Sequence, residues 1–294
     1  MDIVKCQAFL YSVDGGSFSL AGEKMGYTPS GITRMVNALE NEVGFPMLIR
    51  SHSGVILNDD GKRMIPFIRE MVNQHERAMQ LSSEIKGISV GNLTIGAYSS
   101  VAISWLPEII KSFEVDYPNI NINIVEGGKR YLMELLEEKV ADFCFLSEVD
   151  MDFEWIPLAK DELVVWIPEN HPRAKSKSFP LRELNNSPFI KTLSDRDTNI
   201  DRFLERENIK PNVKLTTGDN YSTYAMVSAG LGISVSNKLM SKNWPGNVVT
   251  LHLEPHRYIM LGIALPSFDN ASIAAKKFIE YTKEYLLSTK NASL

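Results

Sequence analysis

Residues 17–42, SFSLAGEKMGYTPSGITRMVNALENE, predict two short helices joined by a tight corner. Ser17 and Thr28 are suited to cap the two helix starts, because their side-chain oxygens can accept a hydrogen bond from an unpaired N–H of the first turn. Gly26 is suited to end the first helix in a left-handed conformation. Pro29 stands at a first helical position, where no N–H donor is needed. Because apolar residues recur at helical spacing on one face of each helix, the stretch predicts a helix-turn-helix.

Polar side chains gather on the other face of the second helix. Arginine can bond guanine at two positions, and serine and threonine can bond base edges or phosphates. A recognition helix reads DNA chiefly with its N-terminal residues, where this cluster lies. An ordinary helical hairpin with a solvated polar face is the alternative that the pattern leaves open. The candidate DNA-binding residues of the motif are Ser17, Thr28, Pro29, Ser30, Thr33, Arg34 and Asn37.

A two-stranded wing is predicted after the second helix. Two short apolar runs, at 47–49 and 55–57, are separated by residues 51–54, which have the composition of a turn. The tip of such a wing can reach a phosphate or the minor groove, so Arg50 and His52 are further candidates for DNA binding. A plain surface hairpin is the alternative.

Further landmarks follow one another in a fixed order over about sixty residues. They are Gly-Ser-Phe-Ser at 16–19, Thr33-Arg34, Leu39-Glu40, Gly-Phe-Pro-Met-Leu-Ile-Arg at 44–50 and ILNDDGK at 56–62. In this order and spacing the segment resembles the N-terminus of LysR-type transcriptional regulators. The resemblance implies a winged helix-turn-helix that binds a pseudo-palindromic promoter in double-stranded DNA. It also implies self-association as a dimer or tetramer, and contact with RNA polymerase if the protein is an activator.

Three residues depart from the pattern of that family. Gly22 and Gly31 stand where alanine is usual, and each costs a helix interior roughly 0.5–1 kcal/mol relative to alanine. Pro29 stands where glutamine is common. This change removes one usual polar contact and leaves the recognised DNA sequence open.

Residues 59–86 predict one long helix with two apolar rows at a spacing of seven. Such rows, in a helix with no domain yet to pack on, predict a dimer seam, while a core helix of the following domain is the alternative. Pro66 is expected to bend or loosen the second turn, and Gly87 and Gly91 mark a hinge. The rows are Met64, Met71, Ala78 and Ile85, beside Ile65, Val72 and Met79.

From residue 90 the pattern alternates between strands and helices. Near-continuous apolar runs such as 141–147 suit parallel strands covered on both faces. The expected strands are 93–98, 120–124, 141–147, 162–168, 188–191, 213–218, 232–236, 248–253 and 258–266, and the expected helices are 102–116, 132–139, 198–207, 221–229 and 273–287.

Two α/β lobes, between which the chain crosses near 161 and 266, resemble a periplasmic-binding-protein-like effector domain of type 2. The same family carries such a domain C-terminally, and DELVVWIPENHP and SAGLGISV resemble its landmarks. The predicted fold is therefore α/β with an all-α N-terminal winged helix-turn-helix and a long linker helix. The predicted limits are 1–58 for DNA binding, 59–88 for the linker and dimerisation helix, 89–161 with 267–294 for lobe I, and 162–266 for lobe II.

Polar residues follow five of the expected strands, where ligands bind in open α/β sheets. A helix start there also favours an anion. In the family resembled these strand ends face one cleft, and its members mostly recognise small organic acids and related metabolites. A helix cap or a solvated surface residue is the alternative for each position, Lys129 included, which would pair with a carboxylate. The candidate effector-binding residues carried over from the resemblance are Ser99, Ser100, Lys129, Ser147, Thr198 and Asn220.

Composition and charge give general limits. The chain has 294 residues, 44% of them hydrophobic, which suits two or three globular domains. It lacks an apolar run of membrane-spanning length and begins with no secretion signal, so we expect a cytoplasmic protein without a membrane partner. The net charge is −5, and residues 1–65 hold six Lys/Arg against seven Asp/Glu. Because DNA-binding modules are usually basic, we expect modest nonspecific DNA affinity with strong salt dependence.

Neither a metal site nor a cofactor is expected. Cys6 and Cys144 are the only cysteines, and Cys144 lies in an apolar run typical of a buried strand. The five histidines show no ligand spacing, since Pro255 interrupts the helical face that His252 and His256 would need. Motifs of phosphate loops, hydrolases and metalloproteases are missing, so no catalytic residue is proposed. The alternative function is a metabolite-sensing α/β binding protein that acts through protein contacts without DNA.

Overall fold

The computed structural model describes residues 1–51, 54–85, 90–147, 153–192, 198–241 and 244–291. The chain divides into two compact units, residues 1–91 with 137–140 and residues 92–136 with 141–294. Among the described residues, no helix is both long and apolar enough to cross a membrane.

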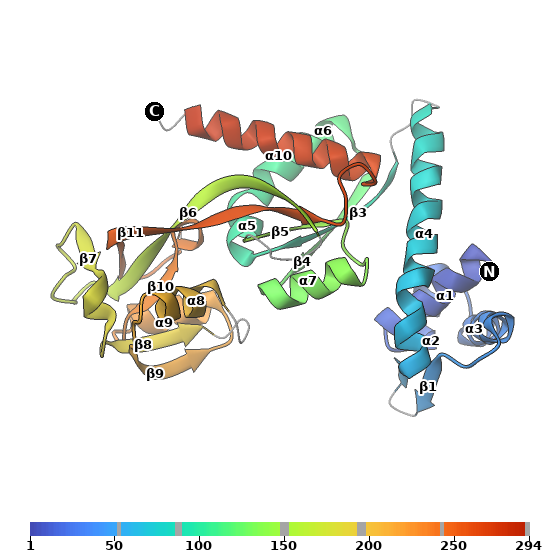
Figure 1. Ribbon diagram of the computed structural model, residues 1–294, viewed down its shortest axis with the longest axis horizontal. Helices are drawn as coiled ribbons and strands as arrows, with labels where there is room; N and C mark the ends of the chain where they lie inside the picture. Colours follow the sequence, from blue (N-terminus) through green and yellow to red (C-terminus); the bar gives the residue numbers. More distant parts are fainter. Residues whose placement is uncertain (52–53, 86–89, 148–152, 193–197, 242–243, 292–294) are drawn as a thin grey trace. The chain divides into compact units, whose positions relative to one another are not determined.

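Three helices open the first unit: α1 (Ile3–Asp14), α2 (Phe18–Met25) and α3 (Pro29–Val43) (Figure 1). Both predicted N-caps are confirmed. Ser17 Oγ accepts from the N–H of Ser19 at 3.1 Å, and Thr28 Oγ1 accepts from the N–H of Gly31 at 3.1 Å. Gly26 ends α2 with φ of 73°, the left-handed conformation in which glycine is favoured. The corner between α2 and α3 therefore forms the expected helix-turn-helix.

One apolar core joins the helices of this unit. Ile32, Val36 and Leu39 of α3 are fully buried, as their spacing predicts. On α1 the buried face includes Cys6 and Phe9, whereas Val4 is 40% exposed. Residues two apart on a helix point about 200° apart, so a stripe that contains Cys6 turns Val4 toward solvent.

The predicted wing is confirmed as an antiparallel pair, β1 (Leu48–Ser51) and β2 (Gly54–Leu57). Glu40 of α3 attaches the wing to the helices. Its Oε1 accepts from the backbone N–H groups of Met47 and Leu48 at 2.7 and 3.1 Å, and its Oε2 pairs with Arg50 at 2.6 Å. The carboxylate therefore fixes the first residues of β1 against α3.

The predicted long helix is confirmed as α4 (Asp59–Ile85). The prediction that its apolar rows form a dimer seam is wrong for the first half of the helix. Ile65 and Val72 are buried in the core of the first unit, and Met64 and Met71 pack against it. These residues were expected in a dimer seam because the sequence offered no partner for them, whereas α1 packs against the first half of α4. The large apolar side chains that stay exposed on α4 are Phe67, Met79, Leu81 and Ile85. Gly87 lies outside the described residues.

The second unit is built on a seven-stranded sheet in the order β10-β6-β11-β5-β3-β4, with β7 paired to β11, and β8 and β9 form a separate parallel pair. Two strands are far longer than predicted. β6 begins eight residues before the expected 162, and 248–253 and 258–266 are one strand with a register shift between His252 and Arg257. The strands are β3 (Gly91–Ala97), β4 (Ile120–Glu126), β5 (Phe143–Ser147), β6 (Glu154–Pro168), β7 (Ser178–Pro180), β8 (Pro188–Thr192), β9 (Asn212–Thr217), β10 (Ser234–Asn237) and β11 (Val248–Leu265).

The long strands β6 and β11 run side by side through both lobes (Figure 1). In lobe I, residues 261–264 of β11 pair with β5, and in lobe II, residues 234–237 of β10 pair with β6. β6 and β11 therefore both contribute to both lobes. Each lobe has its own core, around Phe113, Phe143 and Phe278 in lobe I and around Phe179 and Phe189 in lobe II.

The helix expected at 102–116 is instead two helices, α5 and α6, which meet at Trp105. Pro107 explains the break, because a proline ring clashes with the carbonyl four residues earlier in a continuous helix. The earlier start of α5 places Ser99 and Ser100 in its first turn. The helices of this unit are α5 (Ser99–Ser104), α6 (Leu106–Asp116), α7 (Lys129–Glu137), α8 (Asn199–Arg206), α9 (Asn220–Ser228) and α10 (Ile273–Asn291), with short 3₁₀ turns η1 (Leu181–Leu184) and η2 (Lys238–Ser241).

Candidate functional site

The predicted reading face of α3 is open to solvent. Thr28, Pro29, Ser30, Arg34 and Asn37 are all exposed, and they occupy the first three turns of the helix or its cap. In a helix-turn-helix these are the turns that meet base edges. The helix buries its opposite face in the core of its own unit, so the polar face is free to meet another molecule.

Four of the candidates also have structural roles. Ser17 and Thr28 cap their helices, and Thr28 Oγ1 lies 3.1 Å from Ser30 Oγ. Thr33 is half-buried, and its hydroxyl donates to the carbonyl of Pro29 at 2.9 Å. Such a bond to the preceding turn occupies the hydroxyl hydrogen, so Arg34 and Asn37 have the least committed side chains.

Arg50 lies near the end of β1, close to the tip of the wing, and its guanidinium has partners on two sides. It pairs with Glu40, and it lies 5.3 Å from the ring centre of Phe18. These two contacts restrict the conformation of the Arg50 side chain but leave it 36% exposed. His52 lies outside the described residues.

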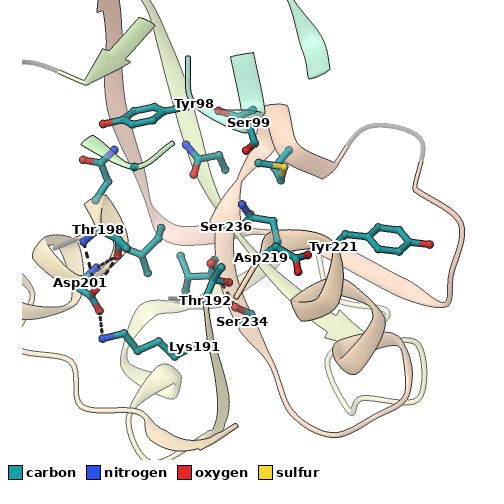
Figure 2. Close-up of a pocket in the computed structure, with 18 of the residues that line it drawn as sticks. Tyr98, Ser99, Lys191, Thr192, Thr198, Asp201, Asp219, Tyr221, Ser234 and Ser236 are labelled. Carbon is teal, nitrogen blue, oxygen red and sulfur yellow. Dashed lines mark hydrogen bonds and ion pairs between the residues drawn. The ribbon is translucent and has the colours of Figure 1, made fainter. Parts of the chain in front are cut away.

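A pocket of about 440 Å³ lies between the lobes of the second unit (Figure 2). Its volume is in the range of small-molecule sites. Lobe I contributes the end of β3, the first turn of α5 and the turn that leads into α7. Lobe II contributes the end of β8, the starts of α8 and α9, and β10.

Five of the six candidate effector residues line this pocket: Ser99, Ser100, Lys129, Thr198 and Asn220. Each lies in the first turn of a helix or caps it. Residues that were predicted because they follow the ends of strands therefore line one pocket, and they come from both lobes. Contact of these residues with an effector stays a prediction.

Ser147, the sixth candidate, lies behind the lining and connects the lobes. Its Oγ donates to Asn199 Oδ1 at 3.0 Å and lies 3.1 Å from the hydroxyl of Tyr98. Because the single Ser147 hydrogen goes to Asn199, Tyr98 must donate to Ser147. Burial raises the pKa of Tyr98, which keeps this phenol protonated as a donor. A chain of two hydrogen bonds thus joins β3 and β5 of lobe I to α8 of lobe II.

The helix starts around the pocket differ in whether a side chain already caps their free backbone N–H groups. Thr198 and Asp201 cap α8 reciprocally, and Asp219 caps α9 by accepting from the N–H of Ser222 at 2.7 Å. Lys191 is likewise paired with Asp201 at 2.7 Å (Figure 2). In contrast, α5 begins without a side-chain cap. The first turn of α5 is therefore a helix start that can offer N–H groups to a bound anion.

Sequence reasoning missed several residues of the pocket. Lys191 and Thr192 end β8, so the strand-end rule would have found them had it been applied to that strand. Ser234 and Ser236 alternate along β10 and point the same way, as residues two apart in a strand do, but nothing in the sequence shows which face of β10 meets the pocket. Among the pocket residues missed are Tyr98, Lys191, Thr192, Asp201, Tyr221, Ser234, Ser236 and Asn237.

Both parts of this architecture match known families. A model described as the LysR substrate binding domain matches residues 87–287, and one described as a bacterial regulatory helix-turn-helix protein of the lysR family matches residues 3–62. The chain belongs to the LysR family. It is a DNA-binding transcriptional regulator with an effector-binding domain, and not an enzyme.

Two similar proteins match nearly the whole chain, and a third matches the effector-binding part. The HTH-type transcriptional regulator YvbU of Bacillus subtilis is 28% identical over 287 residues, which are 97% of this chain and 98% of that protein. Full-length CbnR in complex with its target DNA shares the fold with a TM-score of 0.68 and 16% identity, covering 97% of this chain and all of that one. The effector-binding domain of QuiR in complex with shikimate has a TM-score of 0.60 and 25% identity, covering 68% of this chain and 99% of that one.

Proposed function

We propose that this regulator binds a pseudo-palindromic promoter site through α3 and the wing, and that a small organic acid between the lobes controls its promoter binding or its activation of transcription. The observation that supports the DNA contact is the exposed polar face at the N-terminal end of α3. Arg34 is the proposed base-reading residue, because its guanidinium is exposed and can bond guanine twice. Ser17, Thr28, Ser30, Asn37, Arg50 and His52 are proposed to contact the backbone or neighbouring bases, with Pro29 and Thr33 beside them.

The DNA contact is tested with Arg34→Ala. The duplex is the one that the full-length chain enriches from a random library, and its dissociation constant is measured by gel shift at fixed salt. Loss of a bidentate base contact should cost roughly 1–3 kcal/mol, which is about a 5- to 150-fold weaker affinity. Arg182→Ala, a change at another exposed arginine, in lobe II, is the matched control and should leave the affinity unchanged. Equal affinities for the wild type and Arg34→Ala would remove Arg34 from the reading face.

The chemistry of the pocket supports an organic acid that carries hydroxyl groups. The uncapped first turn of α5 supplies N–H groups to a carboxylate, with the hydroxyls of Ser99 and Ser100 beside them. On lobe II the acidic side chains are committed to helix caps and to Lys191, while Ser236 presents a further hydroxyl. A ligand with its carboxylate at α5 and its hydroxyl groups toward β10 could hydrogen-bond to both lobes. The complex of QuiR with shikimate, itself a hydroxylated carboxylic acid, supports the same class of ligand.

A thermal-shift screen of small mono- and dicarboxylates, with and without hydroxyl groups, tests this assignment. A ligand at 100 times its dissociation constant adds about 2.7 kcal/mol to stability. Ser99→Ala should weaken the binding of a hit, and Ser288→Ala, an exposed serine of α10, should not. A hit whose affinity is the same in Ser99→Ala and in the wild type would place the carboxylate elsewhere.

We further propose self-association through the exposed part of α4, contact with RNA polymerase if the protein is an activator, and action in the cytoplasm, where promoter DNA lies. The proposed functional division is 1–58 for DNA binding, 59–88 for the linker, 89–161 with 267–294 for lobe I, and 162–266 for lobe II. Phe67, Met79, Leu81 and Ile85 support the dimer contact, because they are large apolar side chains at 50–79% exposure on one helix.

A further inference from the structure

Three side chains with metal-binding atoms meet where β6 and β11 pass from one lobe to the other. Glu162 lies on β6, and His252 and His256 lie on β11 at the two ends of its register shift. Val164 is the partner of His252, and Leu163 is the partner of Arg257, so residues 253–256 of β11 have no partner in β6. This irregular segment brings His256 back over the neighbouring strand, next to His252.

The geometry is that of a small, open chelate. Nδ1 of His252 lies 2.8 Å and Nδ1 of His256 lies 2.5 Å from the same oxygen, Glu162 Oε1. One ligand atom from each residue lies within 4.8 Å of the others. The side chain of Glu162 is only 9% exposed, whereas the two imidazoles are 43% and 49% exposed. The carboxylate is therefore held in place by burial, and the rings close over it from the solvent side.

The charges at the cluster favour an ionised carboxylate. The buried Glu162 carboxylate has polar groups on both oxygens, because both imidazoles direct a ring nitrogen at Oε1. Lys238 lies 3.5 Å from the other oxygen, Oε2. Oε1 thus faces the Nδ1 atoms of both imidazoles, and one cation could be bound by these three atoms.

We propose that Glu162, His252 and His256 bind a divalent transition ion of the zinc or nickel type through Oε1 and the two Nδ1 atoms. Two imidazoles and one carboxylate, with a further position open to water, are a ligand set found in zinc sites. Imidazole nitrogen also selects such ions over Mg²⁺ and Ca²⁺, which take oxygen ligands. Metal–ligand distances of about 2.0–2.2 Å require the rings to move outward by less than about 1 Å, which their exposure permits.

The site lies on the strands that join the two lobes. β6 and β11 are the two strands that pass from one lobe to the other, and the ion would tie them together at the irregular segment of β11. Binding at this place changes the cost of moving the lobes only if the ion prefers one arrangement of the strands. The two cysteines do not compete for the metal, because Cys6 and Cys144 are fully buried in other parts of the chain.

The test is the binding of Zn²⁺ and Ni²⁺ to the untagged full-length chain, measured by competition with a chromophoric chelator at pH 7.5. The wild type should bind one ion per chain, with Mg²⁺ unable to displace it. Glu162→Gln and His252→Ala should each weaken the affinity at least tenfold. His75→Ala, a change at an exposed histidine outside the cluster, is the matched control and should bind as the wild type does. Lowering the pH to 5.5 should weaken binding, because protons compete for the imidazoles.

Two further variants keep the test independent of misfolding. His256→Cys retains a metal ligand, so it should still bind one ion and should shift its preference toward Cd²⁺, since thiolates favour softer metals. Lys238→Gln removes the nearby positive charge and should raise the affinity several-fold. Failure of the wild type to bind either ion, or binding of equal affinity in Glu162→Gln, His252→Ala and the wild type, would overturn the assignment.

Discussion

Replacement of Glu40 tests how the wing is held against the recognition helix. The Glu40 side chain is 11% exposed, and its Oε1 accepts from two backbone N–H groups, those of Met47 and Leu48. Hydrogen bonds to a charged group contribute about 1.5–3 kcal/mol each, while the half-exposed pair with Arg50 adds no more than about 1 kcal/mol. Taking the lower value for each N–H bond, Glu40→Ala should destabilise the wing by about 3 kcal/mol. Glu40→Gln keeps an oxygen acceptor and should lose about half of that.

Hydrogen exchange read by mass spectrometry on the full-length chain measures this effect locally. A loss of 3 kcal/mol raises the opening equilibrium by about 150-fold, so peptides that cover residues 45–57 should exchange faster by about that factor. Peptides from β5 should be unchanged, and so should the fluorescence transition of the tryptophans, which all lie in the second unit. Glu42→Ala, two residues further along α3 with its carboxylate on the N-terminus and Lys5, is the matched control. Wing exchange in Glu40→Ala within threefold of that in Glu42→Ala would show that Glu40 does not hold the wing.

Three other changes probe separate parts of the chain. Gly22→Ala should destabilise the first unit by about 1–2 kcal/mol, measured by urea unfolding followed by circular dichroism. The new Cβ would lie 2.6 Å from the carbonyl oxygen of Tyr27, and this overpacking outweighs the gain in helix propensity. A variant more stable than the wild type would contradict this prediction. Leu81→Glu should shift the chain toward monomer in light scattering, whereas Val115→Glu, an equivalent change on α6, should not; equal masses for the two variants would exclude that face of α4. Cys144 should resist alkylation at pH 7.5 until the chain is unfolded, because burial raises the pKa of its thiol to about 12; rapid labelling of native Cys144 would contradict the packing of β5.

Local chemistry made the DNA-binding unit predictable. Caps such as Ser17 and Thr28, and the left-handed end at Gly26, are encoded within a few neighbouring residues. The partners of Ile65 and Val72 were not predictable, because a seven-residue row shows that one side of a helix is apolar but not whether α1 or another chain covers it. The signal for β6 before residue 162 was also weak, since its first residues are not continuously buried.

The pocket was predictable in part for a similar reason. Helix starts after strands are visible in the sequence, and they located Ser99, Thr198 and Asn220. The metal-binding cluster was not visible, because it depends on the register between β6 and β11. His252 and His256 are close in the sequence, but Glu162 is 90 residues away from His252, and only strand pairing shows that the three meet.

The polar face of α3 is proposed to lie in the major groove, with Arg34 on a guanine. Guanine N7 faces that groove, so methylation interference at N7, on the duplex that the full-length chain selects, tests this placement. The wild type should show interfering guanines in two half-sites, separated by about one helical turn or a multiple of it. In Arg34→Ala, interference at one guanine of each half-site should disappear while the others remain. An unchanged pattern in Arg34→Ala, or no interference at any guanine in the wild type, would contradict the account.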